Sequence, residues 1–75
     1  MSVERQLADA RITVGLIPKV FNELDLLQQV TGLSKTDLVN RAISLLLFVT
    51  DQTAAGKQLL VRDVTSGEVE RVHLL

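Results

Sequence analysis

Hydrophobic and polar residues alternate in one short stretch near the start of the chain, residues 11–16, with the sequence RITVGL. Successive side chains of an extended chain point to opposite faces. One face therefore carries Ile12, Val14 and Leu16, and the other carries Arg11, Thr13 and Gly15. The alternation predicts a β-strand. The residues from 18 to 54 predict helices only, so the hydrogen-bonding partner of this strand must come from elsewhere.

The next periodic stretch, residues 18–31, predicts a helix. It starts at Pro18, which suits the first turn of a helix because its missing N–H would have no partner there. The following Gly32 is a good helix terminator. Apolar residues recur at helical spacing and form one broad stripe: Val20, Phe21, Leu24, Leu27 and Val30.

A second helix is predicted from about residue 35 to 54. Ser34 stands at its N-cap position, with Asp37 three residues later, which resembles a capping box. The main apolar stripe comprises Leu38, Ala42, Leu45, Leu46 and Val49, and three more apolar residues lie off it: Ile43, Leu47 and Phe48. A helix that is apolar on several sides is buried on several sides, and one partner helix cannot cover it.

Residues 57–64 and 68–75 predict two strands of a hairpin joined by Thr65-Ser66-Gly67, with glycine where a turn needs positive φ. We expect this hairpin to cover Ile43, Leu47 and Phe48. We also expect cross-strand charge pairs among Glu68, Glu70 and Arg71. The chain thus divides into a flexible N-terminal arm (1–10), a core (11–54) and a C-terminal hairpin (57–75).

Composition adds a reason to expect oligomerisation. The chain has 75 residues, 47% of them hydrophobic, and no cysteine. A chain of this size builds a small core and needs a disulfide, a metal or a second subunit for stability. Disulfides are excluded, and the single histidine, His73, has no neighbouring ligand residues. A second copy of the chain remains. The fold class predicted is α+β, mainly α.

The same survey makes an enzyme the least favoured class of function. The sequence contains no nucleophile–base pair, no metal constellation and no phosphate-binding glycine loop, so we expect no cofactor. It has no apolar run long enough to span a membrane and no signal-peptide pattern. We therefore expect a cytoplasmic protein without a membrane partner. A formal net charge of −1 means that any contact with nucleic acid must rest on a local basic patch.

The order strand, helix, turn and helix resembles the ribbon-helix-helix family of DNA-binding proteins, the MetJ/Arc/CopG superfamily. The resemblance rests on RITVGL, on LDLL in the first helix and on GLSKTDLVNRAI at residues 32–43. It covers residues 11 to about 52. In that family two chains pair their strands antiparallel, and the four helices interlock beneath the ribbon. The resemblance therefore implies a homodimer in which RITVGL pairs with its own copy.

The resemblance also implies a set of DNA contacts. Arg11 and Thr13 match the first two base-contacting positions of the ribbon, and Gly15 matches the third. Arginine can donate two hydrogen bonds to guanine, and threonine can contact a base edge or the thymine methyl. Gly15 departs from the family pattern because it has no side chain. Ser34 and Lys35, at the start of the second helix, match the positions that contact the phosphate backbone.

Two functions follow from these observations. The first is a sequence-specific DNA-binding transcriptional regulator, of the repressor type, that acts as a homodimer on double-stranded DNA. The second is a protein-interaction module, such as an antitoxin or an assembly protein, whose residues 57–75 bind a protein partner. A solvated strand face is the simpler interpretation of Arg11 and Thr13, and helix capping is the simpler interpretation of Ser34. Arg41 is expected on the surface, and Arg5 in the arm.

Overall fold

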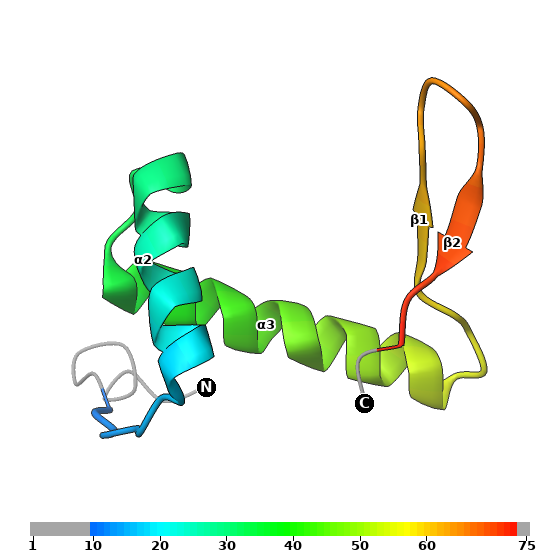
Figure 1. Ribbon diagram of the computed structural model, residues 1–75. Helices are drawn as coiled ribbons and strands as arrows, with labels where there is room; N and C mark the ends of the chain where they lie inside the picture. Colours follow the sequence, from blue (N-terminus) through cyan, green and yellow to red (C-terminus); the bar gives the residue numbers. More distant parts are fainter. Residues whose placement is uncertain (1–9, 74–75) are drawn as a thin grey trace.

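The computed structural model describes residues 10–73 of the chain. Two helices, α2 (Pro18–Thr31) and α3 (Lys35–Ala54), precede two short strands, β1 (Leu60–Arg62) and β2 (Val69–Arg71) (Figure 1). The predicted small α+β fold with mainly helical content is confirmed. The predicted flexible arm falls almost wholly on residues 1–9, including Arg5, and these lie outside the described residues.

The bounds predicted for α2 are those observed. Pro18 lies at the start of the helix, and the residue before it, Ile17, is extended, with φ −66° and ψ 153°. The carbonyl of Ile17 accepts the first helical hydrogen bond, from the Phe21 N–H at 2.9 Å. At the other end Gly32 has a φ of 72°, which only glycine adopts without strain, and its N–H donates to Gln28. This glycine turns the chain towards α3.

The second helix also has its predicted bounds. The Ser34 hydroxyl accepts the backbone N–H of Asp37 at 3.1 Å, which is the expected N-cap bond. The Asp37 carboxylate lies in the first turn, where its charge is favourable next to the positive end of the helix dipole. The helix ends at Ala55, followed by Gly56 with a φ of 86°.

The C-terminal segment forms the predicted hairpin, but its strands are shorter than expected. The register pairs Leu60 with Arg71, Val61 with Glu70, and Arg62 with Val69. Glu70 and Arg71 therefore each lie opposite an apolar residue, and the predicted cross-strand charge pairs are wrong. The strands are short because the loop begins at Asp63, whose carboxylate accepts the N–H groups of Thr65 and Ser66 and closes the turn early.

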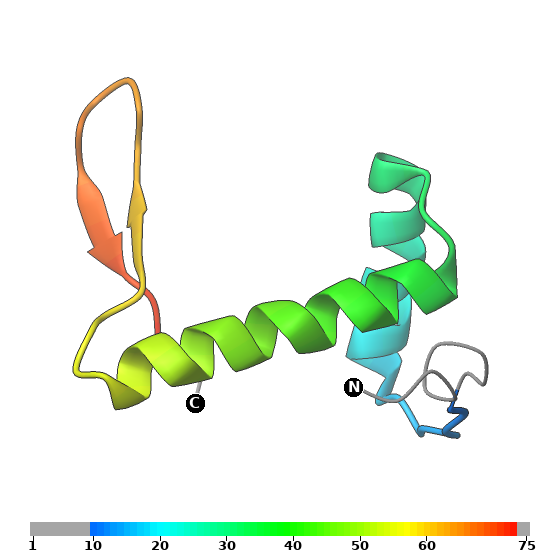
Figure 2. The ribbon, with the colours of Figure 1, turned by 180° about the vertical axis from the view of Figure 1, so that it is seen from behind.

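The chain has the outline of a U, with α3 as its base and with α2 and the hairpin as arms at its two ends (Figures 1 and 2). Two hydrophobic side chains are buried among the described residues: Leu38, where α2 packs on α3, and Val49, beneath the base of the hairpin. The radius of gyration is 16.1 Å, against about 11 Å for a compact domain of this length. A single chain therefore leaves its apolar side chains without a common core.

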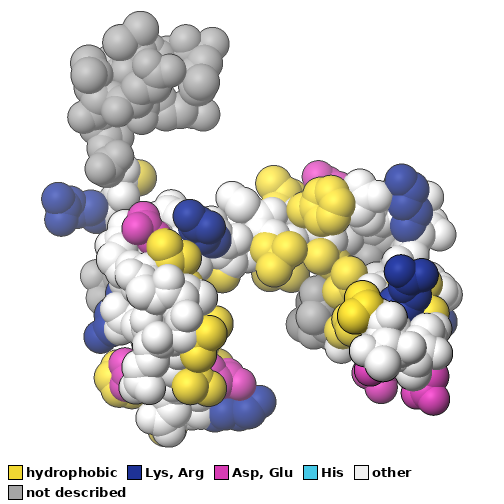
Figure 3. All heavy atoms as spheres, turned by 90° about the horizontal axis from the view of Figure 1, so that it is seen from above, with side chains coloured by type: hydrophobic (Ala, Val, Ile, Leu, Met, Phe, Trp, Pro, Cys, Tyr) yellow, Lys and Arg dark blue, Asp and Glu magenta, His cyan; other side chains and the backbone are white. Residues whose placement is uncertain are grey.

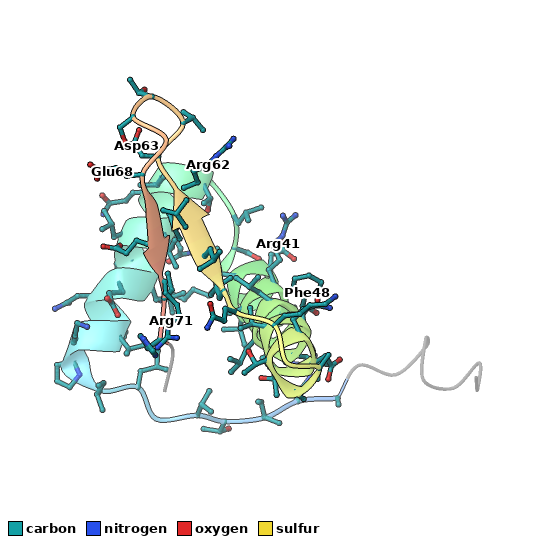
Figure 4. The ribbon with its side chains drawn as sticks, turned by 90° about the vertical axis from the view of Figure 1, so that its right-hand side faces the viewer. Arg41, Phe48, Arg62, Asp63, Glu68 and Arg71 are labelled. Carbon is teal, nitrogen blue, oxygen red and sulfur yellow. The ribbon has the colours of Figure 1, made fainter. Side chains whose placement is uncertain are left out.

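The hairpin does not cover the residues assigned to it from the sequence. Ile43, Leu47 and Phe48 remain 57%, 60% and 60% exposed. The hairpin stands on the end of α3 that carries Val49, so Ile43 and Leu47 lie on an open flank of the helix. Phe48 lies on the opposite flank, on the same side as Arg41 (Figure 4). The expectation that the hairpin of the same chain buries these three residues is wrong.

Candidate nucleic-acid interface

The RITVGL segment, predicted as a strand, is irregular in the structure and pairs with no strand among the described residues. Its apolar side chains Ile12, Val14 and Leu16 are 71%, 59% and 42% exposed. The described residues form one sheet, and it contains only the two hairpin strands. The chain enters α2 directly after Ile17, so the described residues that follow do not turn back to pair with this stretch. Its pairing with a second copy therefore stays a prediction.

The polar face of the same segment is open to solvent. Arg11, Thr13 and Gly15 are all exposed. A Cβ added at Gly15 would meet no atom within 4 Å, and its φ lies outside the left-handed region. This position therefore does not require glycine for the conformation seen in the single chain. The chemistry available on this face is one guanidinium with its fork of N–H donors and one hydroxyl.

The start of α3 supplies the second group of candidate contacts. The Ser34 hydroxyl accepts the Asp37 N–H as the N-cap, and its own O–H can still donate to a phosphate oxygen. The first backbone N–H groups of the helix have no intrahelical partner and suit an anion. Lys35 lies beside them, with its ammonium 5.7 Å from the centre of the Phe21 ring. That distance allows a cation–π contact, which holds Lys35 against α2.

Both groups lie at the end of the molecule opposite the hairpin (Figures 1 and 2). The cations of this part are Arg11, Lys19, Lys35 and Arg41, and its anions are Glu23, Asp25 and Asp37. Lys19 is within 3.7 Å of Glu23, and both side chains are more than half exposed. The excess of positive charge is one. Any affinity for DNA must therefore come from where Arg11 and Lys35 are placed, because bulk attraction to phosphate is small.

A second feature, missed from the sequence, is a groove between α3 and the hairpin. It has a volume of about 540 Å³ and is lined mainly by apolar atoms, from residues including Leu46, Val49, Leu59 and Val72. His73 also borders it and accepts a hydrogen bond from the Arg71 side chain at 3.1 Å. The sequence signal for the groove was the imperfect alternation of the last strand, which leaves Val72 on the face that meets α3.

Residues 10–73 contain no group of three or more His, Cys, Asp or Glu side chains placed to hold a metal ion. None of the helices in this part is both long and apolar enough to cross a membrane. Comparisons with family models, with curated proteins and with solved structures find no match for this chain.

Proposed function

We propose that the chain is a homodimeric, sequence-specific DNA-binding regulator of the repressor type. One observation carries the proposal: an exposed segment of alternating apolar and polar residues, unpaired among the described residues, leads directly into two helices whose apolar side chains are mostly exposed. The segment needs an edge to pair with, and the helices need apolar cover. A second copy of the chain supplies both through one twofold axis.

Pairing of the two RITVGL segments accounts for the exposed apolar face. In an antiparallel ribbon, Ile12, Val14 and Leu16 of both chains would point to one side, onto the helices, and would lose their contact with water. Burying an aliphatic side chain of this size stabilises by about 1.5–3 kcal/mol. Three such residues from each chain provide a substantial driving force for dimerisation.

The opposite face of the ribbon then becomes the DNA-binding surface. The major groove admits a two-stranded β-ribbon. The twofold axis would place two copies of Arg11 and two of Thr13 on this face, and a bidentate arginine–guanine contact contributes about 1–3 kcal/mol of discrimination. The start of α3, with Lys35, lies at the same end of the chain and would contact the phosphate backbone. Since one ribbon contacts few base pairs, several dimers would bind side by side on repeated sites.

The test is selection of bound sequences from a random pool of double-stranded DNA, followed by titration of the enriched site. Arg11→Ala should weaken binding to that site about 10- to 100-fold and relax the preference at one base pair in each half of the site. Lys57→Ala is the control, because it removes one positive charge at the end of the chain that carries the hairpin and should leave binding unchanged. Equal binding by the wild type and Arg11→Ala, with both dimeric, would falsify base contact by the ribbon.

A protein-interaction module on the same scaffold is the second candidate. The apolar groove beside the hairpin and the exposed Phe48 favour it, because contiguous exposed apolar surface marks a contact with another protein. An antitoxin or an assembly protein would use residues 57–75 for that contact. Failure to enrich any sequence from the DNA pool, in a protein that is a stable dimer, would favour this second function.

A further inference from the structure

One face of the hairpin combines exposed apolar and basic side chains. Because side chains alternate along a strand, the observed register places Leu60 and Val69 on one face together with Arg62 and Arg71. The opposite face carries Leu59 and Val72, which are half-buried beside Val49. The first face is called the Leu60 face below. Leu60 and Arg71 border the pockets beside α3 at the base of the hairpin, and Arg62 and Val69 lie farther from the helix.

The Leu60 face is both apolar and basic. Leu60 is 52% exposed and Val69 is 56% exposed. Arg62 extends from β1 and Arg71 from β2, and both are exposed (Figure 4). An isolated two-stranded hairpin is marginally stable in water, because it needs further packing against another element. A surface that packs on this face should offer aliphatic side chains next to carboxylates.

The matching surface in the described part of the chain lies on α2. Residues 23, 26, 27 and 30 share one face of a helix because they are three, four and seven positions apart. They are Glu23, Leu26, Leu27 and Val30, and we call this set the Val30 face. Val30 is 75% exposed, Leu26 58% and Leu27 48%. The carboxylate of Glu23 is bound only to an exposed lysine at 3.7 Å, so it is available to another cation.

The two complementary faces cannot meet within one chain. The hairpin and α2 stand at opposite ends of α3 (Figures 1 and 2), and 20 residues of helix separate them by about 30 Å. In a twofold dimer with antiparallel α3 helices, however, the C-terminal end of each α3 lies beside the N-terminal end of its partner. That arrangement brings each hairpin next to α2 of the other chain.

We propose that the Leu60 face of each hairpin docks on the Val30 face of α2 in a second copy of the chain, so that the hairpins act as reciprocal clasps of the homodimer. The inference rests on the homodimer of the proposed function and assigns its C-terminal extension. Arg62 or Arg71 pairs with Glu23 of the other copy, and Leu60 and Val69 cover Leu26 and Val30.

The solvent-exposed area of the chain favours a second copy of the chain as the partner that covers these faces. The chain exposes 7124 Å², whereas a compact chain of its mass exposes about 4600 Å². The excess is roughly 2500 Å² per chain, or roughly 5000 Å² for two, which lies at the upper end of obligate homodimer interfaces. Hydrophobic side chains line α3 between the two arms and the sides of the arms that face each other (Figure 3). The two copies need both arms to cover this much surface.

The absence of cysteine from the sequence makes a direct test available. Val30→Cys chains are mixed with Val69→Cys chains and treated with a short bismaleimide. We expect an efficient link between the two variants and little link in either variant alone, because the two hairpins of the dimer lie at opposite ends. Val64→Cys replaces Val69→Cys as the matched control: Val64 is 88% exposed in the hairpin loop and should link poorly.

Introducing a carboxylate at position 69 gives a second test of the clasp. Val69→Glu should weaken dimerisation at least about tenfold in a sedimentation titration, while Val64→Glu leaves it unchanged. A stable dimer with no Val30–Val69 link and no effect of Val69→Glu would overturn the clasp and leave the homodimer standing. Efficient linking of Val69→Cys alone would also overturn it, since the hairpins would then meet each other. A wild-type chain that sediments as a monomer would overturn the homodimer itself.

Discussion

The two extended regions of this chain, residues 10–17 and the hairpin, differ in where their partners lie along the sequence. Both contain alternating apolar residues with similar exposure: Val14 is 59% exposed and Val61 is 56% exposed. In the hairpin a turn at Asp63 and Gly67 returns the chain onto itself, and the strands pair. After residue 16 the chain enters a helix at Pro18 and never returns. Strand pairing within a chain therefore follows the turn rather than the strand pattern.

In the proposed dimer, the pairing of residues 11–16 would depend on protein concentration, whereas the pairing of the two hairpin strands with each other would not. When a strand pairs within its own chain, the entropy cost of closing the loop arises once, during folding. A strand that closes on a second copy depends on mass action, so its stability falls as the protein is diluted. The substitutions below are ordered from the largest expected effect to the smallest, and each compares one position in the first region with one in the hairpin.

Val14→Asp should produce the largest effect. In the proposed dimer it places a carboxylate between the ribbon and the helices, and an unpaired buried charge destabilises by about 3 kcal/mol or more. Val61→Asp is the matched change in the hairpin, on the face opposite Leu60, where the side chain stays in water and the cost is below about 1 kcal/mol. Urea denaturation at several protein concentrations measures both. Equal destabilisation by the two changes would contradict the assignment of residues 10–17 to a dimer interface.

The same contrast explains which features could be predicted from the sequence. The bounds of α2 and α3 are set by local signals at Pro18, Gly32 and Ser34, and all of them were predicted. The strand lengths were predicted incorrectly, because the apolar pattern places Asp63 within a strand although its carboxylate closes the turn. The position of the hairpin over Val49 depends on contacts between distant residues, which a pattern of apolar residues does not specify.

The features of the candidate site likewise differ in whether local sequence or contacts between distant residues determine them. The sequence alone identified the exposed positions of Arg11, Thr13 and Gly15, because alternation assigns them to one face. It also predicted the Ser34 cap, which the bond from Asp37 confirms. It did not reveal that Lys35 lies over the Phe21 ring, because that contact depends on how α2 meets α3. The Val30 and Leu60 faces became recognisable only when the register of the hairpin and the separation of the two arms were known.

The two glycines of these regions give a smaller and more local contrast. Gly67 has a φ of 78°, and Gly15 lies outside the left-handed region. Gly67→Ala should therefore destabilise by about 1 kcal/mol, because a Cβ disfavours the left-handed conformation. Gly15→Ala should be neutral or slightly stabilising, because it lowers the entropy of the unfolded chain. Thermal unfolding at one protein concentration measures both. A loss of stability from Gly15→Ala as large as that from Gly67→Ala would show that position 15 is closely packed in the dimer.

Acidification should have the smallest effect: it should loosen the hairpin turn and leave the proposed ribbon of residues 11–16 unaffected. The backbone N–H groups of Ser66 and Thr65 donate to the Asp63 carboxylate and lower the pKa of this group from its ordinary value of 3.8. A lowered pKa means that the ionised form stabilises the folded turn. The stabilisation is complete above the ordinary pKa and is lost as the pH falls through the lowered one. Residues 11–16 contain no carboxylate, so their pairing lacks this dependence.

Amide hydrogen exchange of Thr65 and Ser66 follows the turn directly. Between about pH 5 and about pH 2, exchange should speed up beyond its intrinsic pH dependence at these two amides, while the amides of residues 11–16 keep their protection. Asp63→Asn retains an acceptor oxygen but cannot titrate, so its turn should show no such change. An identical loss of protection in the Asn variant would show that other carboxylates cause the effect. Gly67, rather than the charge of Asp63, would then be the residue that stabilises the turn.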